Sequence, residues 1–396
     1  MRTLMIAPQP FFQPRGTPFS VLHRLKALAS LGYKVDLLTY HLGEDVGIEG
    51  VMIYRIPRVP FVKNIAIGPS KRKIILDAYL LATACKMLAS GNYDLIHSHE
   101  EAGFFASYLA RAYKTLHLYD MHSSLPQQLS NFKYTKSKML KRVFKHLESR
   151  TIDGANAVIT ICPELFNYVE KLVPGKFNVL IENVADNSLV FDSTVHETAI
   201  RESIRTNGEA IVLYTGTFEA YQGIDLLIAS SRRIVRENQN VRFVLVGGKP
   251  DQIHSYESQV RNLSLQDHFL FTGSVAPEEV PAYIDASDIL VSPRIEGNNT
   301  PLKIYSYLRS GKPIVATDHV THTQVLDQDV SVLTNTTPES FGDGVLSVLN
   351  SQDLRRRITK NAKRLADTKY SYPVYLKKTK EVYQHLENKL RERSRF

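Results

Sequence analysis

The chain has 396 residues, more than one hydrophobic core usually holds, so two domains are expected. Its hydrophobic content of 43% is typical of globular proteins, and the absence of any uninterrupted apolar run of 18 residues excludes a membrane-spanning helix by pattern. The formal net charge of +9 favours anionic partners but does not choose among nucleotides, nucleic acid and an anionic lipid surface.

Strand-like runs alternate with helical segments along the chain. In the first half we expect strands at 3–7, 35–39, 52–56, 95–98, 115–119, 158–161 and 179–182. Apolar density falls over 186–209, which we interpret as a linker with its flanks. The alternation then resumes with expected strands at 210–214, 242–246, 269–271, 289–292, 314–316 and 331–333. This order predicts an α/β protein with two doubly wound Rossmann-like domains, 1–190 and 205–371, and a helix over 372–396 that could pack back on the first.

The segment ILVSPRIEGNNTPLKIYSYLRSGKPIVATD, residues 289–318, predicts a strand, a loop, a helix and a second strand. We expect Thr300 to be the helix N-cap and Pro301 its first residue, with Gly311 ending the helix. The loop 294–299 would then lie at the carboxyl end of a parallel strand and over a helix N-terminus. Backbone N–H groups and the helix dipole favour an anion at such a place.

A loop of the same design follows the first strand. Arg15 and Gly16 lie in a proline-rich loop, and Thr17-Pro18 opens a helix that Gly32 ends. Two similar loops, one near each end of the chain, predict two similar domains that face each other.

With both halves laid out, the chain resembles the retaining nucleotide-sugar glycosyltransferases of family four, which have the two-Rossmann-domain GT-B fold. The resemblance spans nearly the whole chain and rests on PRGTPFSVLHRLKALASLGYKVDLLT, DLIHSHE, LYDMHSS, LYTGTFEAYQGIDLLIAS, VRFVLVGG and SPRIEGNNTPLKIYSYLRSGKPIVATD in that order. It implies hexosyl transfer from a nucleoside diphosphate sugar to a glycan, a lipid-linked acceptor or a small molecule. It implies no cofactor, no metal and no nucleic-acid partner.

The sequence departs from the family's motif at four positions. The two motif glutamates fall on Asn298 and Ser306, and the Arg and Lys of the donor loop fall on Thr217 and Gln222. Neutral polar groups therefore replace the side chains that usually hold the ribose and neutralise the diphosphate. The other cations that could compensate are Lys249, Arg294 and Lys303.

The resemblance assigns residues to each role. His122 and Glu296 are the candidate catalytic residues, although His122 could equally be an ordinary strand-end histidine and Glu296 could simply pair with Arg294. The acceptor-side loop is formed by Arg15, Gly16 and Thr17. Donor binding is assigned to Gly216, Thr217, Gln222, Lys249, Arg294, Gly297, Asn298, Asn299, Thr300, Pro301, Leu302, Lys303 and Ser306.

Two further interpretations concern metal and membrane. His97 and His99 alternate along DLIHSHE, and we expect opposite orientations and no metal pair with Glu100. The basic segments 133–146 and 61–73 could be solvated surface or could contact an anionic membrane. Two isolated cysteines and a start without signal-peptide architecture favour the cytoplasm, with peripheral attachment to the inner face of the membrane as an option.

Two rival functions remain open. The four motif departures would suit an accessory protein that binds a sugar nucleotide without turnover. A sugar-nucleotide epimerase of the same fold would need no acceptor.

Overall fold

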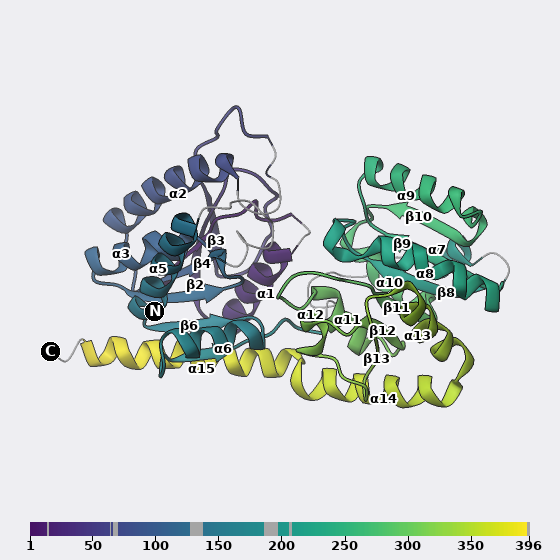
Figure 1. Ribbon diagram of the computed structural model, residues 1–396. Helices are drawn as coiled ribbons and strands as arrows, with labels where there is room; N and C mark the ends of the chain where they lie inside the picture. Colours follow the sequence, from purple (N-terminus) through teal and green to yellow (C-terminus); the bar gives the residue numbers. More distant parts are fainter. Residues whose placement is uncertain are drawn as a thin grey trace. The chain divides into compact units, whose positions relative to one another are not determined.

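The computed structural model describes residues 1–13, 16–63, 65, 70–126, 138–185, 197–205 and 208–393. Contacts divide the chain into two compact units, which are described separately (Figure 1). The first unit holds Met1–Asn183 with Pro373–Phe396, and the second holds Val184–Tyr372. In the described part of the chain, no helix is long and apolar enough to cross a membrane.

The first unit is built on a parallel sheet in the order β3-β2-β1-β4-β5-β6-β7. Its strands are β1 (Arg2–Ala7), β2 (Lys34–Thr39), β3 (Val51–Arg55), β4 (Leu95–His99), β5 (Leu116–Met121), β6 (Ala157–Thr160) and β7 (Asn178–Leu180). Strands β4 and β5 are buried along their whole length, because helices cover a parallel sheet on both faces.

Six helices of the described residues surround this sheet. They are α1 (Gly16–Ser30), α2 (Lys71–Ser90), α3 (Ala102–Ala112), α5 (Lys138–Gly154), α6 (Pro163–Leu172) and α15 (Tyr372–Arg393). The last helix follows the second unit in sequence but belongs almost entirely to the first, where its Thr379, Val382, Tyr383 and Leu386 are buried (Figure 1).

The second unit has a parallel sheet in the order β10-β9-β8-β11-β12-β13. The strands are β8 (Ala210–Thr215), β9 (Val241–Val246), β10 (Phe269–Gly273), β11 (Ile289–Ser292), β12 (Ile314–Thr317) and β13 (Val332–Thr334). The helices are α7 (Glu197–Ile204), α8 (Ile224–Glu237), α9 (Pro250–Asn262), α10 (Val280–Ala286), α11 (Leu302–Arg309), α12 (Val320–Thr323), α13 (Pro338–Asn350) and α14 (Gln352–Lys369), with short 3-10 turns at Ala220–Gln222, Gln266–His268 and Pro277–Glu279.

Successive strand residues of this sheet enter two hydrophobic cores, as the two-residue period of a strand requires. Leu213 and Leu290 pack with α10, α11 and α14, whereas Val212 and Ile289 pack with α8, α9 and α13. Every strand expected from the sequence is present, with ends that differ by at most two residues. Two parallel α/β units with helix-covered sheets confirm the predicted fold class.

Two local expectations are wrong. The segment 186–209 is not only a linker, because it contains α7, whose Ile200 and Ile204 are buried in the core of the second unit. Thr300 does not cap α11, and Pro301 is not its first residue. Pro301 has an extended backbone (ψ 137°) and is itself the N-cap, so the helix begins at Leu302.

Candidate functional site

The sheet of the second unit changes its direction of winding between β8 and β11, which are neighbours in the sheet but far apart in sequence. Ligands of open α/β sheets bind beyond the carboxyl ends of the strands at such a switch point. The loop after β8 begins with Gly216, and the loop after β11 begins with Pro293. The sequence-predicted donor residues therefore converge at the expected edge of the sheet.

Close backbone contacts hold these loops together. A Cβ atom on Gly223 would lie 2.0 Å from the Pro293 carbonyl oxygen, and one on Gly247 would lie 1.9 Å from that of Gly216. Both glycines have positive φ, 74° and 123°, which side chains with a Cβ rarely adopt. Glycine is therefore required for the three loops to approach one another this closely.

Lys303, in the first turn of α11, points its ammonium group at the glycine loop after β8. Its Nζ atom lies 3.6 Å from the centroid of the Tyr214 ring and would lie 3.2 Å from a Cβ on Gly216. This nitrogen is buried and has no hydrogen-bond partner among the described residues. Burial and the nearby Arg294 guanidinium hold the pKa of Lys303 well below its usual value. An anion that binds beside this nitrogen would favour its protonated form, because an opposite charge raises the pKa of an amine.

Arg294 supplies a second cation at this edge. Its guanidinium carbon lies 5.0 Å from the Tyr221 ring centroid, and its Nε donates to the Glu296 carbonyl oxygen at 2.8 Å. Burial lowers the pKa of Arg294, and the carbonyl bond fixes the side chain in place. Gly297 lies directly against the guanidinium. The two cations reinforce each other's positive potential where the three loops meet.

Other predicted donor residues lie on the same loops with different exposure. Gln222 is buried, and its Oε1 has no hydrogen-bond partner among the described residues. Thr217 is exposed, and its carbonyl accepts from the Tyr214 hydroxyl at 2.7 Å. Lys249 is largely exposed, with its Nζ 3.6 Å from Glu219 Oε1. Lys249 is thus a more solvated cation than Lys303.

The loop before α11 carries the remaining predicted residues. Glu296 is exposed, and the structure places its carbonyl, not its carboxylate, against Arg294. The Asn298 carbonyl accepts from Gln324 Nε2 at 2.6 Å. Thr300 is buried, and its hydroxyl has no partner in the part of the chain that the structure describes. The half-buried side chains of this stretch are Asn298, Asn299, Leu302 and Ser306.

Sequence reasoning missed three buried residues at this edge. Tyr214 forms the ring under Lys303, and the Tyr307 hydroxyl accepts from the Thr215 backbone N–H at 3.1 Å. His322 joins two strand ends, with Nε2 2.8 Å from Ser292 Oγ and Nδ1 2.9 Å from the Thr317 carbonyl. Burial lowers the pKa of His322 to about 3, so its imidazole is neutral. In the sequence, the one feature that could have indicated Tyr214 was its position two residues before the loop glycine Gly216.

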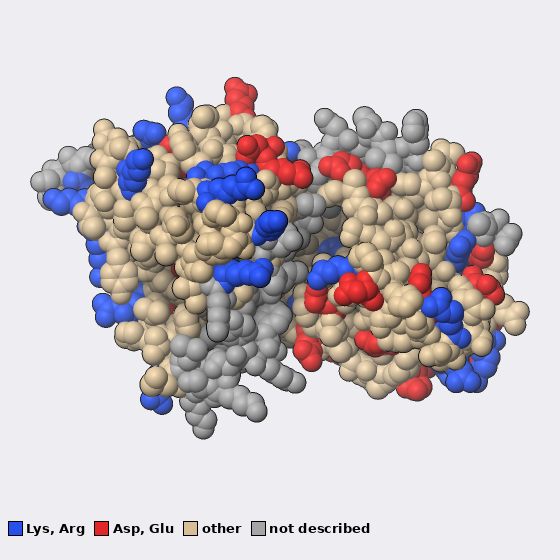
Figure 2. Space-filling view, turned by 90° about the horizontal axis from the view of Figure 1, so that it is seen from above, with Lys and Arg blue, Asp and Glu red and all other residues tan. Residues whose placement is uncertain are grey.

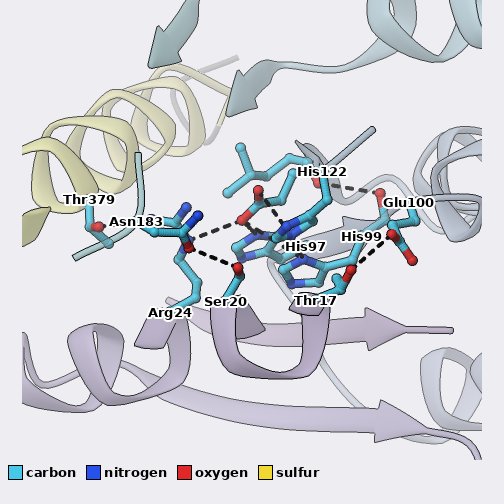
Figure 3. Close-up of polar contacts among 12 residues, drawn as sticks. Thr17, Ser20, Arg24, His97, His99, Glu100, His122, Asn183 and Thr379 are labelled. Carbon is cyan, nitrogen blue, oxygen red and sulfur yellow. Dashed lines mark hydrogen bonds and ion pairs between the residues drawn. The ribbon is translucent and has the colours of Figure 1, made fainter. Parts of the chain in front are cut away.

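The first unit has a buried polar cluster at the carboxyl ends of β4 and β5 (Figure 3). Asp120 accepts from Arg24 Nε at 3.0 Å, and Arg24 also donates to the Thr379 hydroxyl of α15 at 3.0 Å. Burial disfavours the ionised carboxyl, but the guanidinium of Arg24 and the surrounding imidazoles hold the pKa of Asp120 well below its usual value. The pair is therefore an ionised salt bridge in the interior.

His122 belongs to this cluster. It follows β5 directly and is buried, with Nε2 2.9 Å from His99 Nδ1 and 3.4 Å from Asp120 Oδ1. Burial lowers the pKa of His122 and of His99, so both rings are neutral at pH 7. Asp120 and His99 thus fix the orientation of the His122 ring through its Nε2 atom.

The expected orientation of His97 and His99 is wrong. Residues two apart in a strand point to the same face, and the two rings stack with centroids 4.8 Å apart. Their ligating nitrogens and an Asp120 carboxylate oxygen lie within 4.8 Å of one another, and Glu100 is not in this group. The Arg24 guanidinium already occupies the cation position against Asp120, and His97 Nδ1 lies 2.9 Å from the Tyr383 hydroxyl. These contacts pair most of the cluster with the protein's own groups, while His99 Nε2 and Asp120 Oδ1 have no hydrogen-bond partner among the described residues.

On the acceptor-side loop, Arg15 lies outside the described residues. Gly16 begins α1, one residue earlier than predicted, and the Thr17 hydroxyl donates to Glu100 Oε1 at 3.2 Å (Figure 3). Burial and the neighbouring Glu101 raise the pKa of Glu100 to about 7. Thr17 and Glu100 thus join the first turn of α1 to the residue that follows β4.

The two basic segments are only partly described, since residues 64, 66–69 and 133–137 lie outside the described ranges. In α5 the Phe144 ring packs near Phe104, with centroids 6.2 Å apart, while Met139 is 75% exposed. On the face seen in Figure 2, Lys and Arg side chains are interspersed with Asp and Glu, so the positive charge is not gathered into one continuous surface there.

Comparison with known families accounts for both units. Residues 196–365 match the model described as glycosyl transferases group 1, and residues 14–183 match that of glycosyltransferase family 4. Among relatives, the chain is 24% identical over 284 residues to a putative glycosyltransferase, YtcC, of Bacillus subtilis, covering 66% of this chain and 67% of that one. It is 21% identical to phosphatidyl-myo-inositol mannosyltransferase of Mycobacterium tuberculosis, covering 97% of each chain.

Solved structures share the fold. Sucrose-phosphate synthase from Thermosynechococcus elongatus aligns with a TM-score of 0.80 at 19% identity, covering 98% of this chain and 99% of that one. Anabaena HepE, solved in complex with UDP, aligns with a TM-score of 0.74 at 16% identity, covering 98% of this chain and 100% of that one.

Proposed function

Because the chain belongs to the family of glycosyl transferases group 1 and is a glycosyltransferase, we propose that it transfers a sugar from a nucleoside diphosphate sugar bound at the carboxyl edge of the second unit's sheet. The observation that carries the proposal is the buried Lys303 nitrogen, which faces the Gly216 loop and has no acidic partner among the residues that the structure describes. A diphosphate would supply the missing negative charge. UDP is the first nucleotide to test, because the structural neighbour HepE was solved with it.

Lys303 and Arg294 take over a task that relatives give to two donor-loop cations. Here that loop carries the neutral Thr217 and Gln222. When the bond between the anomeric carbon and the diphosphate oxygen breaks, the leaving oxygen gains negative charge. The oxygen of an acceptor hydroxyl forms the new bond to that carbon, and its proton passes to the leaving diphosphate. Fixed cations in a buried setting stabilise that charge without reorganising. Leaving-group stabilisation by these side chains requires no metal in the proposed mechanism.

Retention of anomeric configuration is part of the proposal and rests on the family resemblance. His122 is assigned to the sugar and the acceptor, with Asp120 and His99 fixing its ring. A neutral imidazole can both accept and donate a hydrogen bond, which suits contact with sugar hydroxyls. Glu296 is assigned to the transferred sugar, because it is the one carboxylate in the loop 294–303.

For the acceptor we propose a lipid-linked molecule. The mannosyltransferase relative is named for a phosphatidyl-myo-inositol acceptor, and α5 exposes Met139 and Val143 beside basic residues. Basic amphipathic helices of this kind lie against anionic lipid, and salt weakens the contact. Co-sedimentation with anionic vesicles at low and high ionic strength tests this part; no binding at low salt contradicts it.

The enzymatic test is turnover of purified protein with a panel of nucleoside diphosphate sugars, with and without a glycolipid extract and with or without a chelator. The proposal expects acceptor-dependent release of nucleoside diphosphate that survives chelation. Donor conversion that ignores the acceptor would indicate the epimerase alternative. Saturable donor binding with no reaction under any condition would indicate an accessory protein. NMR of the product reports whether the anomeric configuration is retained.

A further inference from the structure

The second unit has a cavity of about 780 Å³ at the edge of the sheet opposite to Lys303. Its lining includes Ala210 and Ile289, the first residues of β8 and β11, and Pro313, which precedes β12. These are the amino ends of parallel strands, whereas the proposed donor site lies at the carboxyl ends. The cavity is therefore separate from the site described above.

The lining of the cavity is strongly basic. Its two acidic residues are Glu209 and Asp288, and Asp288 is already paired with Arg205 at 2.5 Å. The six basic residues outnumber them: Arg205, Lys312, Arg355, Arg356, Lys360 and Lys363. Cations gathered around a concave surface raise its positive potential, because the low-dielectric walls focus the field.

Two of these cations have structural tasks. Arg355 donates to the carbonyls of Val348 and Leu349 at 2.7 and 2.6 Å, where it caps the end of α13. Lys312 donates to the Asp285 carbonyl at 2.8 Å, and burial lowers its pKa. Their presence is explained by the fold alone, and they add charge to the cavity as well.

Arg205 is paired with Asp288, and the remaining three cations have no such explanation. Arg356, Lys360 and Lys363 are exposed on α14 and make no side-chain ion pair or hydrogen bond with the described residues. Their spacing of four and three residues places them on one face of the helix, where like charges repel one another. The same face lines the cavity. The arrangement costs stability when empty, and a multiply charged anion would relieve it.

We propose that this cavity binds a soluble phosphate-bearing small molecule, of the size of a diphosphate or a sugar phosphate, through Arg356, Lys360 and Lys363. The volume falls in the usual range for small-molecule pockets, about 300–1,000 Å³. Phosphate is the favoured chemistry because ammonium and guanidinium groups both donate charge-assisted hydrogen bonds to its oxygens.

The test is calorimetric titration of the full chain with inorganic pyrophosphate in a Lys303→Met background, which weakens the donor site. Lys360→Gln/Lys363→Gln is expected to raise the Kd about tenfold, since two charge-assisted contacts are lost. Arg357→Gln/Arg364→Gln is the matched control. It removes the same charge from an adjoining face of α14 that does not line the cavity, and it should change the Kd less than twofold.

The proposal is wrong if the two double variants raise the Kd for pyrophosphate equally, or if neither of them changes it. Thermal unfolding checks that both variants fold, and Arg356→Gln offers a second, single-residue test. A second arm uses anionic vesicles: if Lys360→Gln/Lys363→Gln abolishes vesicle binding but leaves pyrophosphate binding intact, the cavity serves a lipid surface and the proposal is wrong. Because pyrophosphate binding at the cavity is measured without Lys303, its outcome is independent of the donor-site proposal.

Discussion

The Nζ atom of Lys303 lies 3.6 Å from the centroid of the Tyr214 ring, and no carboxylate in the described part of the chain pairs with it. An aromatic face is attractive to a cation but does not replace a hydrogen-bonded anion. The contact positions the ammonium while leaving its hydrogen atoms available. Lys303 is thus fixed in a position where it could donate hydrogen bonds to an anionic ligand.

Nucleotide binding should take up a proton. Burial and Arg294 keep the pKa of Lys303 well below its usual value in the free protein, and a bound diphosphate would raise it. At a pH above the free-state pKa, UDP binding therefore protonates Lys303, and affinity falls as pH rises further. Titration calorimetry in two buffers of different ionisation enthalpy should give different binding enthalpies. Identical enthalpies in both buffers would speak against a titrating Lys303.

Gly223→Ala should damage the donor site more than Gly311→Ala. Both glycines have φ near 75°, so each alanine pays a similar backbone strain of about 1–2 kcal/mol. Only at Gly223 does the added Cβ also meet the Pro293 carbonyl oxygen, whereas at Gly311 nothing lies within 4 Å. Urea unfolding and UDP titration of the two variants isolate the steric part. Equal losses of stability and of UDP affinity in the two variants would show that the loops need no close approach.

Asp120→Asn should destabilise the first unit by about 3–5 kcal/mol, because it leaves the buried Arg24 charge without its partner. Asp45→Asn is the control, since Asp45 pairs with Arg55 but is 77% exposed, and its loss should cost less than about 1 kcal/mol. A depressed carboxyl pKa stabilises the fold above the ordinary value of about 3.9 and loses this effect only as pH falls through the folded value. In denaturant unfolding, the difference in the free energy of unfolding between Asp120→Asn and the wild type should therefore stay constant between pH 8 and pH 5.

Glu296→Gln should lower transfer far more than Ser306→Ala. Glu296 is the only acidic side chain left in the loop, and a carboxylate accepts hydrogen bonds from two sugar hydroxyls. Ser306 is too short to span the distance that a glutamate covers, so its ribose contact would need a water molecule. Turnover of both variants with the active donor makes the comparison. Small and equal reductions of turnover in the two variants would show that other residues bind the sugar.

Hydrophobic periodicity was sufficient to predict the strands, because buried parallel strands are short apolar runs between helical segments. It was insufficient at Thr300-Pro301, because hydrophobic periodicity does not determine which of these two residues is the N-cap of α11. The extended backbone of Pro301 decides in favour of a start at Leu302. The linker was misjudged because α7 presents only Ile200 and Ile204 to the core within a polar segment.

The site was predicted from loop composition, and its buried partners were not. Nothing local to the sequence pairs Lys303 with Tyr214, which lies 89 positions earlier (303 − 214) on a different strand. The Arg24–Asp120 pair joins residues 96 positions apart, and α15 completes it through Thr379. Such contacts follow from strand order, which brings distant strand ends to one edge and which alternation alone does not specify.

The most direct test of the account is calorimetric titration of UDP into wild type, Lys303→Met and Lys249→Met. Both substitutions remove one ammonium group, but Lys303 is buried against the glycine loop and Lys249 is largely exposed beside Glu219. The account predicts that Lys303→Met weakens UDP binding by about 1.5–3 kcal/mol, at least tenfold in Kd, while Lys249→Met changes it less than threefold. Unchanged affinity in Lys303→Met would contradict the assignment of this ammonium to the diphosphate.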